Sequence, residues 1–319
     1  MNQVQLGKSD IQITPVIMGT WQAGKQMWAG IDDGETQRAL RAAFDAGITT
    51  IDTASMYGNG HSERIIARSL GDVRHEVVYA TKVFANQLAR DQVFKACHQS
   101  LRNLNTDHID LYQIHWPAGS FGSRPVPVSE TLGAMAKLKQ QGKIRAIGVS
   151  NFSRAQLEEA LQVTRIDSLQ PPYSLFWRQV EDDAIPLCRQ EQVTVLAYSP
   201  LAQGILTGKF GPEHQFDKGD HRAKNRLFHP DIYPSVQSAL TRLQPIADDH
   251  GVTLGQLALA WIIAHPNTCA IAGARNAAQV EQNAGAARTR LSEAVMAEMD
   301  TISRTVTKLL DDDHVMWNF

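Results

Sequence analysis

The chain has 319 residues, of which 43% are hydrophobic and 20% are charged, and its formal net charge is −2. This composition is ordinary for a globular protein with a large core, and so small a charge gives no reason to expect a nucleic-acid partner. The N-terminal segment is polar and no apolar run approaches the ~20 residues of a spanning helix, which argues against a signal peptide and a membrane protein. We therefore expect a cytoplasmic protein.

The cysteines and the acidic residues give no sign of a special site. Cys97, Cys188 and Cys269 are odd in number and widely spaced, which argues against a disulfide framework or a zinc site. Buried, inert thiols are expected instead. Residues 311–313 are three consecutive aspartates near the C-terminus, for which we expect a solvated tail.

In chain order, the first pattern is an alternation of polar and apolar residues over 3–14, which predicts a β-hairpin at the bottom of the fold. Eight short runs rich in β-branched residues follow. Several are apolar almost throughout, as in strands of a parallel sheet that is covered on both faces. The runs span residues 16–21, 48–54, 77–83, 109–116, 144–151, 168–173, 193–199 and 268–274.

Segments with helical spacing separate these runs. They include residues 35–46, 91–104 and 129–141, and Ser153 stands where a fourth helix needs its N-cap. Strands that alternate with helices predict a closed (β/α)8 TIM barrel, with an open, doubly wound sheet as the alternative. Residues 201–232 break the repeat as a long loop after the seventh strand, and loops of this length are usually functional.

Four reactive side chains stand at, or just beyond, the ends of three consecutive runs. Asp52 ends the second run, Tyr57 lies in the loop that follows, Lys82 ends the third run and His115 ends the fourth. In a barrel, the carboxyl ends of all strands meet at one mouth. Each residue alone has an ordinary explanation, as a cap, a packing aromatic, a surface lysine or a core histidine. Together they form a set that suits the reduction of a carbonyl group.

Hydride addition to a carbonyl group builds negative charge on an oxygen atom, which then needs a proton. Tyr57 is the candidate general acid, and Lys82 is expected to lower the phenol's pKa from its ordinary value of about 10. Asp52 keeps Lys82 charged and oriented in this hypothesis. His115 hydrogen-bonds the carbonyl oxygen and stabilises its developing charge.

Along nearly its whole length the sequence resembles the aldo-keto reductases. The resemblance implies one barrel domain over residues 1–319, an oxidoreductase activity, and a catalytic tetrad of Asp52, Tyr57, Lys82 and His115. Ser55 is a small departure, since many relatives have an acidic residue there. The matching segments, in the family's order, are DTASMYG (52–58), TKV (81–83), QIHWP (113–117), GVSN (148–151), QPPYS (170–174), YSPLAQGILTGK (198–209) and GARNAAQVEQN (273–283).

The resemblance also implies a hydride donor, NADPH, lying across the barrel mouth. No GxGxxG motif follows the first strand, and no convincing flavin or metal motif is present, so a Rossmann site is not indicated. Ser150, Asn151 and Gln170 end the fifth and sixth strands and offer the donors and acceptors that a carboxamide needs. Tyr198 is a candidate to stack on the nicotinamide. The glycines and Lys209 of the following loop suit a pyrophosphate.

Arg275 opens the last barrel helix and is the candidate partner of an adenosine 2′-phosphate. The best-known family members have lysine at the position of Gly273 and arginine at that of Gln279, so fewer positive charges support the preference for NADPH here. The expected cofactor contacts are Gly19, Thr20, Trp21, Asp52, Ser150, Asn151, Gln170, Tyr198, Ser199, Pro200, Leu201, Gln203, Gly204, Lys209, Gly273, Arg275, Gln279 and Asn283.

Aromatic side chains are expected to line the substrate pocket. Trp21, Phe84, His115 and Trp116 are the expected contacts, and Trp28, the loop 201–232 and residues 314–319 are further candidates. A pocket of this kind accepts many small carbonyl compounds, and the sequence names none of them.

Two other functions fit parts of the pattern. The β subunits of voltage-gated potassium channels share the fold, the tetrad and the cofactor but act as regulators, and the lack of an extended N-terminal region weighs against them. An unrelated barrel lyase or isomerase predicts a phosphate or metal site and no binding of NADPH. The resemblance leaves homo-oligomerisation open.

Overall fold

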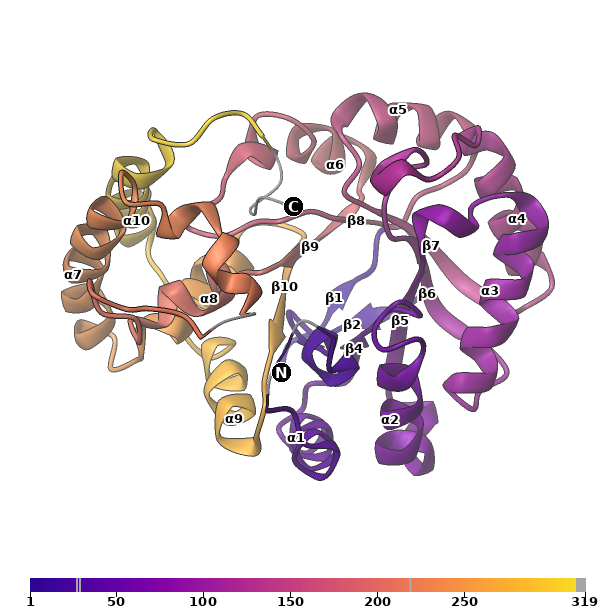
Figure 1. Cartoon of the computed structure of the whole chain (residues 1–319), viewed down its shortest axis with the longest axis horizontal. Helices are drawn as coiled ribbons and strands as arrows, with labels where there is room; N and C mark the ends of the chain where they lie inside the picture. The colour runs from indigo at the N-terminus through magenta and orange to yellow at the C-terminus, as the bar shows by residue number, and fades with distance from the viewer. Residues whose placement is uncertain (27, 29, 218–219, 314–319) are drawn as a thin grey trace.

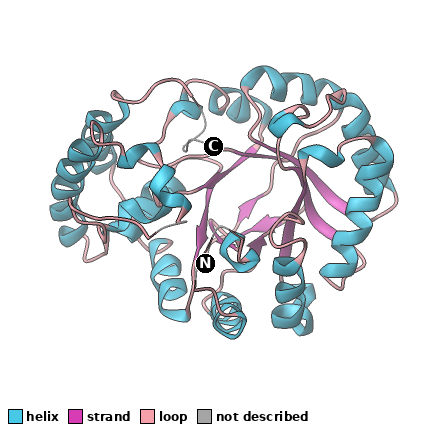
Figure 2. Ribbon diagram, in the orientation of Figure 1, coloured by secondary structure: helices cyan, strands magenta, loops and turns pink. Residues whose placement is uncertain are grey.

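The barrel predicted from the alternating pattern is present and closed. In the computed structural model, which describes residues 1–26, 28, 30–217 and 220–313, eight parallel strands pair in the order β10-β3-β4-β5-β6-β7-β8-β9. Helices surround this ring of strands (Figures 1 and 2). The alternative of an open, doubly wound sheet is wrong, because the first and last barrel strands, β3 and β10, are hydrogen-bonded neighbours.

Each of the eight predicted runs contains one barrel strand. The strands are β3 (Val16–Gly19), β4 (Thr50–Asp52), β5 (Val78–Val83), β6 (Ile109–Ile114), β7 (Ile144–Ser150), β8 (Ser168–Gln170), β9 (Thr194–Tyr198) and β10 (Thr268–Gly273). The helices are α1 (Asp33–Asp45), α2 (His61–Leu70), α3 (Arg90–Asn103), α4 (Val128–Gln140), α5 (Arg154–Val163), α6 (Ile185–Glu191), α7 (Tyr233–Asp249), α8 (Leu254–Ala264), α9 (Ala277–Ala286) and α10 (Glu293–Thr307). The described part of the long loop 201–232 contains three short 3₁₀ helices and leads into α7.

Helix ends follow the signals in the sequence. Ser153 caps α5 in a reciprocal capping box with Gln156, as its position predicted. α1 begins after Asp32, whose side chain accepts a hydrogen bond from the Glu35 N–H. Gly47 follows the same helix with a φ of +81°, a conformation that glycine adopts easily.

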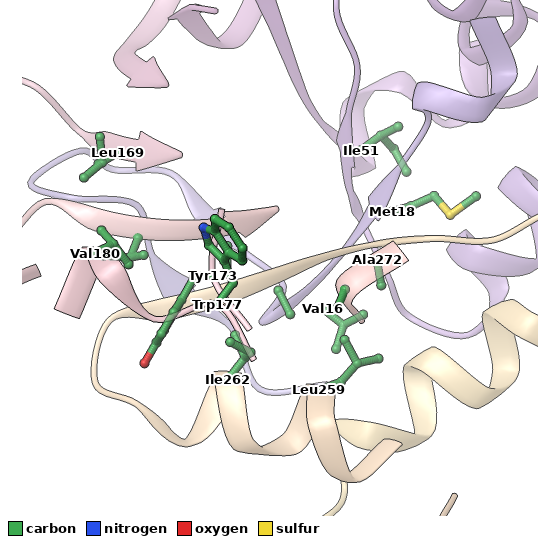
Figure 3. Packing of buried hydrophobic residues seen from close by; sticks show 14 of the residues in the cluster. Val16, Met18, Ile51, Leu169, Tyr173, Trp177, Val180, Leu259, Ile262 and Ala272 are labelled. Atoms are coloured by element: carbon green, nitrogen blue, oxygen red, sulfur yellow. The ribbon is translucent and has the colours of Figure 1, made fainter. Parts of the chain in front are cut away.

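The apolar core has two layers. Inside the barrel, side chains such as Ile17, Leu111 and Leu196 pack against one another. A larger layer lies between the strands and the helices, where Figure 3 shows Leu259 and Ile262 of α8 directed toward the barrel. α7 and α10 lie side by side on one flank of the molecule (Figure 1).

The predicted N-terminal hairpin closes the bottom of the barrel. β1 (Val4–Gln5) and β2 (Gln12–Ile13) pair antiparallel, and Leu6 packs into the barrel's interior layer. The Gly7 N–H donates a hydrogen bond of 2.8 Å to Oγ1 of Thr194, the first residue of β9. Since the hairpin covers this end of the barrel, the open end is the opposite one, where the carboxyl ends of the strands meet and where functional sites of such barrels lie.

Outside the barrel mouth, the cysteines and the acidic patch follow the expectations from the sequence. All three cysteines are free and buried, and burial raises the pKa of each thiol to about 12. The aspartates at 311–313 are exposed, as in a solvated tail, and Asp311 and Asp313 also form ion pairs with Arg226 of the loop 201–232. The Arg226 side chain is only 15% exposed, and a cation so covered needs a counter-charge. None of the described helices is both long and apolar enough to cross a membrane.

Candidate active site

The four residues expected to form a catalytic set meet at the open mouth of the barrel. Asp52 is the last residue of β4, Lys82 is the penultimate residue of β5, and His115 directly follows β6. Tyr57 lies in the turn between β4 and α2, and its ring meets the His115 ring edge-on with the centroids 5.7 Å apart. The Lys82 Nζ atom lies 5.3 Å from the centroid of the Tyr57 ring. The structure therefore brings all four side chains together.

A buried ion pair forms the floor of the site. Lys82 Nζ donates to Oδ1 of Asp52 over 2.6 Å and to the carbonyl oxygen of Thr53 over 2.8 Å. Lys82 has no exposed surface and Asp52 is 4% exposed. The second carboxylate oxygen, Oδ2, accepts from Nε2 of Gln170 over 2.9 Å and from Nε2 of Gln113 over 3.4 Å. Charges so deeply buried persist only when paired and hydrogen-bonded, and both conditions are met here.

Burial controls the protonation of Tyr57. Burial raises the phenol's pKa well above its ordinary value, and the negative charge of Asp52 raises it further. This corrects the expectation that the phenol's pKa is lowered: in this structure the loss of hydration is the largest influence on Tyr57. Lys82 itself has a lowered pKa because of its burial, which Asp52 and then Glu63 oppose. The phenol is therefore fully protonated at neutral pH, which is the state that a proton donor needs.

His115 is a neutral imidazole. Burial holds its pKa well below the ordinary value, and the positive charge of Lys82 lowers it further. Its Nδ1 atom is buried and has no hydrogen-bond partner among the described residues. A neutral ring carries one proton, and Nδ1 has no acceptor for it, so we assign the proton to Nε2. In this tautomer the imidazole can donate a hydrogen bond through Nε2.

The residues expected to hold a carboxamide are linked to the same network. The Tyr198 hydroxyl donates to Oδ1 of Asn151 over 2.9 Å, and Nδ2 of Asn151 donates to the backbone oxygen of His115 over 3.0 Å. Ser150 Oγ donates to the backbone oxygen of Gln170 over 2.8 Å. These hydrogen bonds fix the polar rim beside the tetrad and keep its amide groups oriented.

The loop after β9 contains a cluster of left-handed residues. Ser199, Ala202, Gln203 and Gly204 all have positive φ angles, of 51°, 47°, 56° and 100°. The N–H groups of Ala202 and Gly204 donate to the backbone oxygens of Ser199 and Leu201, so these two groups hold the turn together. A Cβ atom on Gly204 would lie 2.9 Å from Cε of Lys209, so the lysine side chain crosses the loop at the glycine.

Three cations from two segments, the loop 201–232 and the turn from β10 to α9, converge here. Lys209 has a pKa lowered by burial and by the positive charges of Arg222 and Arg275. The pKa of Arg275 is lowered by burial and by Arg222. Trp28 lies against both guanidinium groups, whose Cζ atoms are 5.3 Å (Arg275) and 5.8 Å (Arg222) from its ring centroid. Arg222 also donates from Nε to Oδ1 of Asp220 over 2.9 Å. Such a concentration of positive charge favours a bound anion.

Aromatic rings form a wall on the other side of His115. Phe84 meets the His115 ring edge-on at 5.6 Å, and Phe121 stacks on Phe84 at the same centroid distance. Trp116 meets Phe121 edge-on at 5.1 Å. Phe121 is 53% exposed and has a φ of +55°, which is unusual for a bulky side chain. The predicted pocket residues Phe84, His115 and Trp116 are thus neighbours through Phe121.

The remaining predicted residues lie around this mouth. Thr20 follows Gly19 at the end of β3 and donates through Oγ1 to the backbone oxygen of Asp52 over 2.9 Å. Trp21 meets Trp28 edge-on at 5.3 Å. Trp28, a further candidate for the substrate pocket, lies between Trp21 and the guanidinium groups of Arg222 and Arg275. Residues 314–319, also candidates, lie outside the described residues.

The turn from β10 to α9 carries the last predicted contacts. The Arg275 N–H donates to Oε1 of Gln279 over 2.8 Å, and Asn276 caps α9 through the Gln279 N–H. Asn283 Nδ2 donates to the backbone oxygen of Gly273 over 3.2 Å. In this structure the side chains of Gln279 and Asn283 thus hold the turn that presents Arg275. Pro200 and Leu201 belong to the turn after β9 described above.

The sequence profile of the Aldo/keto reductase family matches residues 15–304. The chain belongs to this family. The aldo-keto reductase YhdN of Bacillus subtilis is 37% identical over 293 residues, which cover 88% of this chain and 87% of YhdN. A glycerol dehydrogenase structure from Gluconobacter oxydans superposes with a TM-score of 0.88, at 32% identity and with 97% of each chain covered. An aldo-keto reductase from Klebsiella pneumoniae in complex with NADPH gives a TM-score of 0.75 at 31% identity, with both chains fully covered. This chain is accordingly an oxidoreductase with the family's (β/α)8 barrel.

In this aldo-keto reductase, sequence reasoning missed residues that act through tertiary contact. Gln113 points at Asp52 from β6, and its only sequence signal is its place two residues before His115. Gly24 and Gly58 hold the Tyr57 turn: a Cβ atom on Gly24 would lie 2.7 Å from the carbonyl carbon of Tyr57. Arg222 lies in the loop 201–232, far from Arg275 in the sequence, and the fold brings it beside Arg275.

Proposed function

We propose that this aldo-keto reductase reduces aldehydes or ketones to alcohols with NADPH, and that Tyr57 is the general acid. The observation that carries the proposal is the buried Lys82–Asp52 ion pair next to a protonated phenol and a neutral imidazole at one barrel mouth. These groups match the needs of an oxygen atom that gains negative charge and then a proton.

The residues around the mouth fit a phosphorylated dinucleotide. Lys209, Arg222 and Arg275 supply positive charge for the phosphate groups. Ser150 and Asn151 offer polar groups for a carboxamide next to His115. The Klebsiella relative, which contains NADPH, supports the same choice of cofactor. When bound, NADPH supplies the hydride that forms the new C–H bond.

The protein's own residues complete the reaction at the substrate oxygen. Nε2–H of His115 donates a hydrogen bond to the carbonyl oxygen and orients it. As the C=O π pair moves onto oxygen, the Tyr57 hydroxyl transfers its proton there, and an alcohol results. Lys82 stabilises the negative charge left on the phenol oxygen, and Asp52 holds Lys82 in its charged form. The wall of Phe84, Trp116 and Phe121 excludes water from the reacting group.

The test is oxidation of NADPH in the presence of a panel of aldehydes and ketones, including small dicarbonyl and aromatic compounds. Turnover with several of them supports the proposal. Quenching of tryptophan fluorescence by NADPH without any turnover would point to a regulatory subunit of the potassium-channel β type. Neither quenching nor turnover would indicate an unrelated barrel enzyme.

A further inference from the structure

A second buried carboxylate lies behind the catalytic lysine. Glu63, in the first turn of α2, has no exposed surface. Its Oε1 accepts a hydrogen bond of 2.8 Å from Oγ1 of Thr81, the residue before Lys82 in β5. Its Oε2 accepts one of 2.8 Å from Nδ2 of Asn103, the last residue of α3. The carboxylate therefore ties α2 and α3 to the strand that carries the lysine.

Both of these hydrogen-bond donors are neutral, so they leave the charge of Glu63 uncompensated. A buried charge without a countercharge is expensive, and the N-terminal end of α2 offsets only part of that cost. Arg64 Nη1 donates a hydrogen bond of 3.3 Å to Asn103 Oδ1, so Arg64 affects Glu63 only indirectly, through Asn103. Lys82, the residue after Thr81 in β5, is a fully buried cation. The negative charge of Glu63 favours the protonated form of Lys82.

We propose that Glu63 is a positioning residue for the reaction: through Thr81 it fixes the end of β5, and its buried charge keeps Lys82 protonated. This inference rests on the function proposed above, since it assumes that Lys82 must be charged when Tyr57 gives up its proton. Asp52 supplies the direct contact to Lys82, and Glu63 supplies a second negative charge from the opposite, helix-facing side of β5.

The other titratable groups around Glu63 and Lys82 do not supply this charge. Cys97 of α3 and Tyr112 of β6 interact with Glu63, but burial keeps both neutral, with the pKa of Cys97 raised to about 12 and that of Tyr112 raised well above its ordinary value. On the mouth side, Tyr57 is protonated and His115 is neutral. Among these described groups the balance around Lys82 is therefore set by Asp52 and Glu63.

Removal of a negative charge lowers the pKa of any nearby acid, whether that acid is the ammonium of Lys82 or the phenol of Tyr57. After either change, kcat/KM declines at a lower pH than in the wild type. The position of this decline on the alkaline side of the pH profile, called the alkaline limb here, therefore reports the charge of Glu63. A purely structural effect of the substitution would not move it.

The experiment compares pH profiles of NADPH-dependent aldehyde reduction for wild type, Glu63→Gln and Thr81→Val. Glu63→Gln removes the charge at nearly constant shape, and its alkaline limb should move to lower pH by roughly one unit, as expected for one charge several ångströms away in a protein interior. Thr81→Val cuts the same hydrogen bond but keeps the charge. It should lower the melting temperature and leave the limb where it is.

A Glu63→Gln limb that coincides with that of wild type overturns the proposal, as does an equal shift in Thr81→Val. If Glu63→Gln does not fold, Glu63→Asp decides: the shorter side chain keeps the charge but cannot reach Thr81. Its limb should stay in place while kcat falls by roughly tenfold, since small misplacement of a reacting group costs up to about 10² in rate. An unchanged kcat in Glu63→Asp overturns the proposal as well. A wild-type protein without turnover is a different result, which refutes the proposed function itself.

Discussion

At the scale of single residues, the Lys82–Asp52 ion pair supplies the two charges at the centre of the site. Both members are buried, so the two charges depend on each other. Lys82→Met should abolish most aldehyde reduction and also destabilise the fold by about 3–5 kcal/mol, because it leaves an unpaired buried carboxylate. Denaturant unfolding and NADPH oxidation measure the two effects.

The double variant Lys82→Met/Asp52→Asn separates those effects. Removal of both charges should recover part of the lost stability but none of the activity. Recovery of activity together with stability would show that the lysine serves the fold alone, and wild-type activity in Lys82→Met would remove it from the mechanism.

His115 gives a second prediction at this scale. An ordinary histidine with a pKa of about 6.5 becomes charged as the pH falls through that value. In this protein the folded pKa lies well below it, so the imidazole stays neutral and keeps its Nε2–H. We expect kcat/KM to show no limb centred near pH 6.5, and so to stay level from about pH 7.5 down to about pH 5.5. A limb near pH 6.5 that disappears in His115→Asn would contradict the neutral assignment.

At the scale of elements, the sequence could predict whatever depends on local pattern. The strands, the Ser153 cap and the hairpin follow from periodicity and turn residues. Asp52, Lys82 and His115 could be predicted as site residues, because the carboxyl ends of all barrel strands meet at one mouth. The left-handed Phe121 could not be predicted, since nothing local marks a phenylalanine for a φ of +55°. Arg222 and Gln113 act through contacts between distant elements, which no local pattern encodes. The direction of the Tyr57 pKa was wrong because burial cannot be measured from neighbouring residue types.

The variant Gly24→Ala tests the close contact between Gly24 and the turn that contains Tyr57. The added Cβ would meet the backbone of Tyr57 at 2.7 Å, so the Tyr57 turn must move. Activity should fall by roughly 10- to 100-fold, as expected for a misplaced reacting group, while the protein stays folded. Gly133→Ala in α4 is the matched control: no atom lies within 4 Å of its new Cβ, so it should keep full activity and gain about 0.5–1 kcal/mol of stability. Equal activity in both variants would show that the Gly24 contact is irrelevant to catalysis.

Cofactor preference belongs to the same scale, because two separate segments, the loop 201–232 and the β10–α9 turn, supply the cations. Arg275→Ala should weaken NADPH binding by roughly tenfold, the lower end of what a charge-assisted contact contributes, since Lys209 and Arg222 remain. NADH binding should change little, because it lacks the 2′-phosphate. The dissociation constants of both cofactors measure this, with Arg290→Ala, on the exposed segment after α9, as the control. An equal loss for NADH and NADPH would show that Arg275 holds the adenosine or the turn in general.

At the scale of the whole molecule, the fold divides its two ends between stability and chemistry. The hairpin closes the bottom, where Gly7 and Leu6 contact the strands, and the mouth is left to the polar network. The loop 201–232 crosses the mouth's rim and is held from outside by Asp311 and Asp313 through Arg226. The proposed carbonyl reduction requires that Tyr57, at this mouth, donates a proton to the substrate oxygen.

The most direct test of that claim is Tyr57→Phe, which removes the hydroxyl and keeps the ring. We predict that aldehyde reduction falls by about 10²–10⁴, the usual contribution of a positioned general acid, while the dissociation constant for NADPH stays nearly unchanged. Steady-state NADPH oxidation and fluorescence titration with NADPH, on the same preparations of both proteins, provide the two numbers. A Tyr57→Phe protein that binds NADPH normally and keeps most of the wild-type activity would contradict the account.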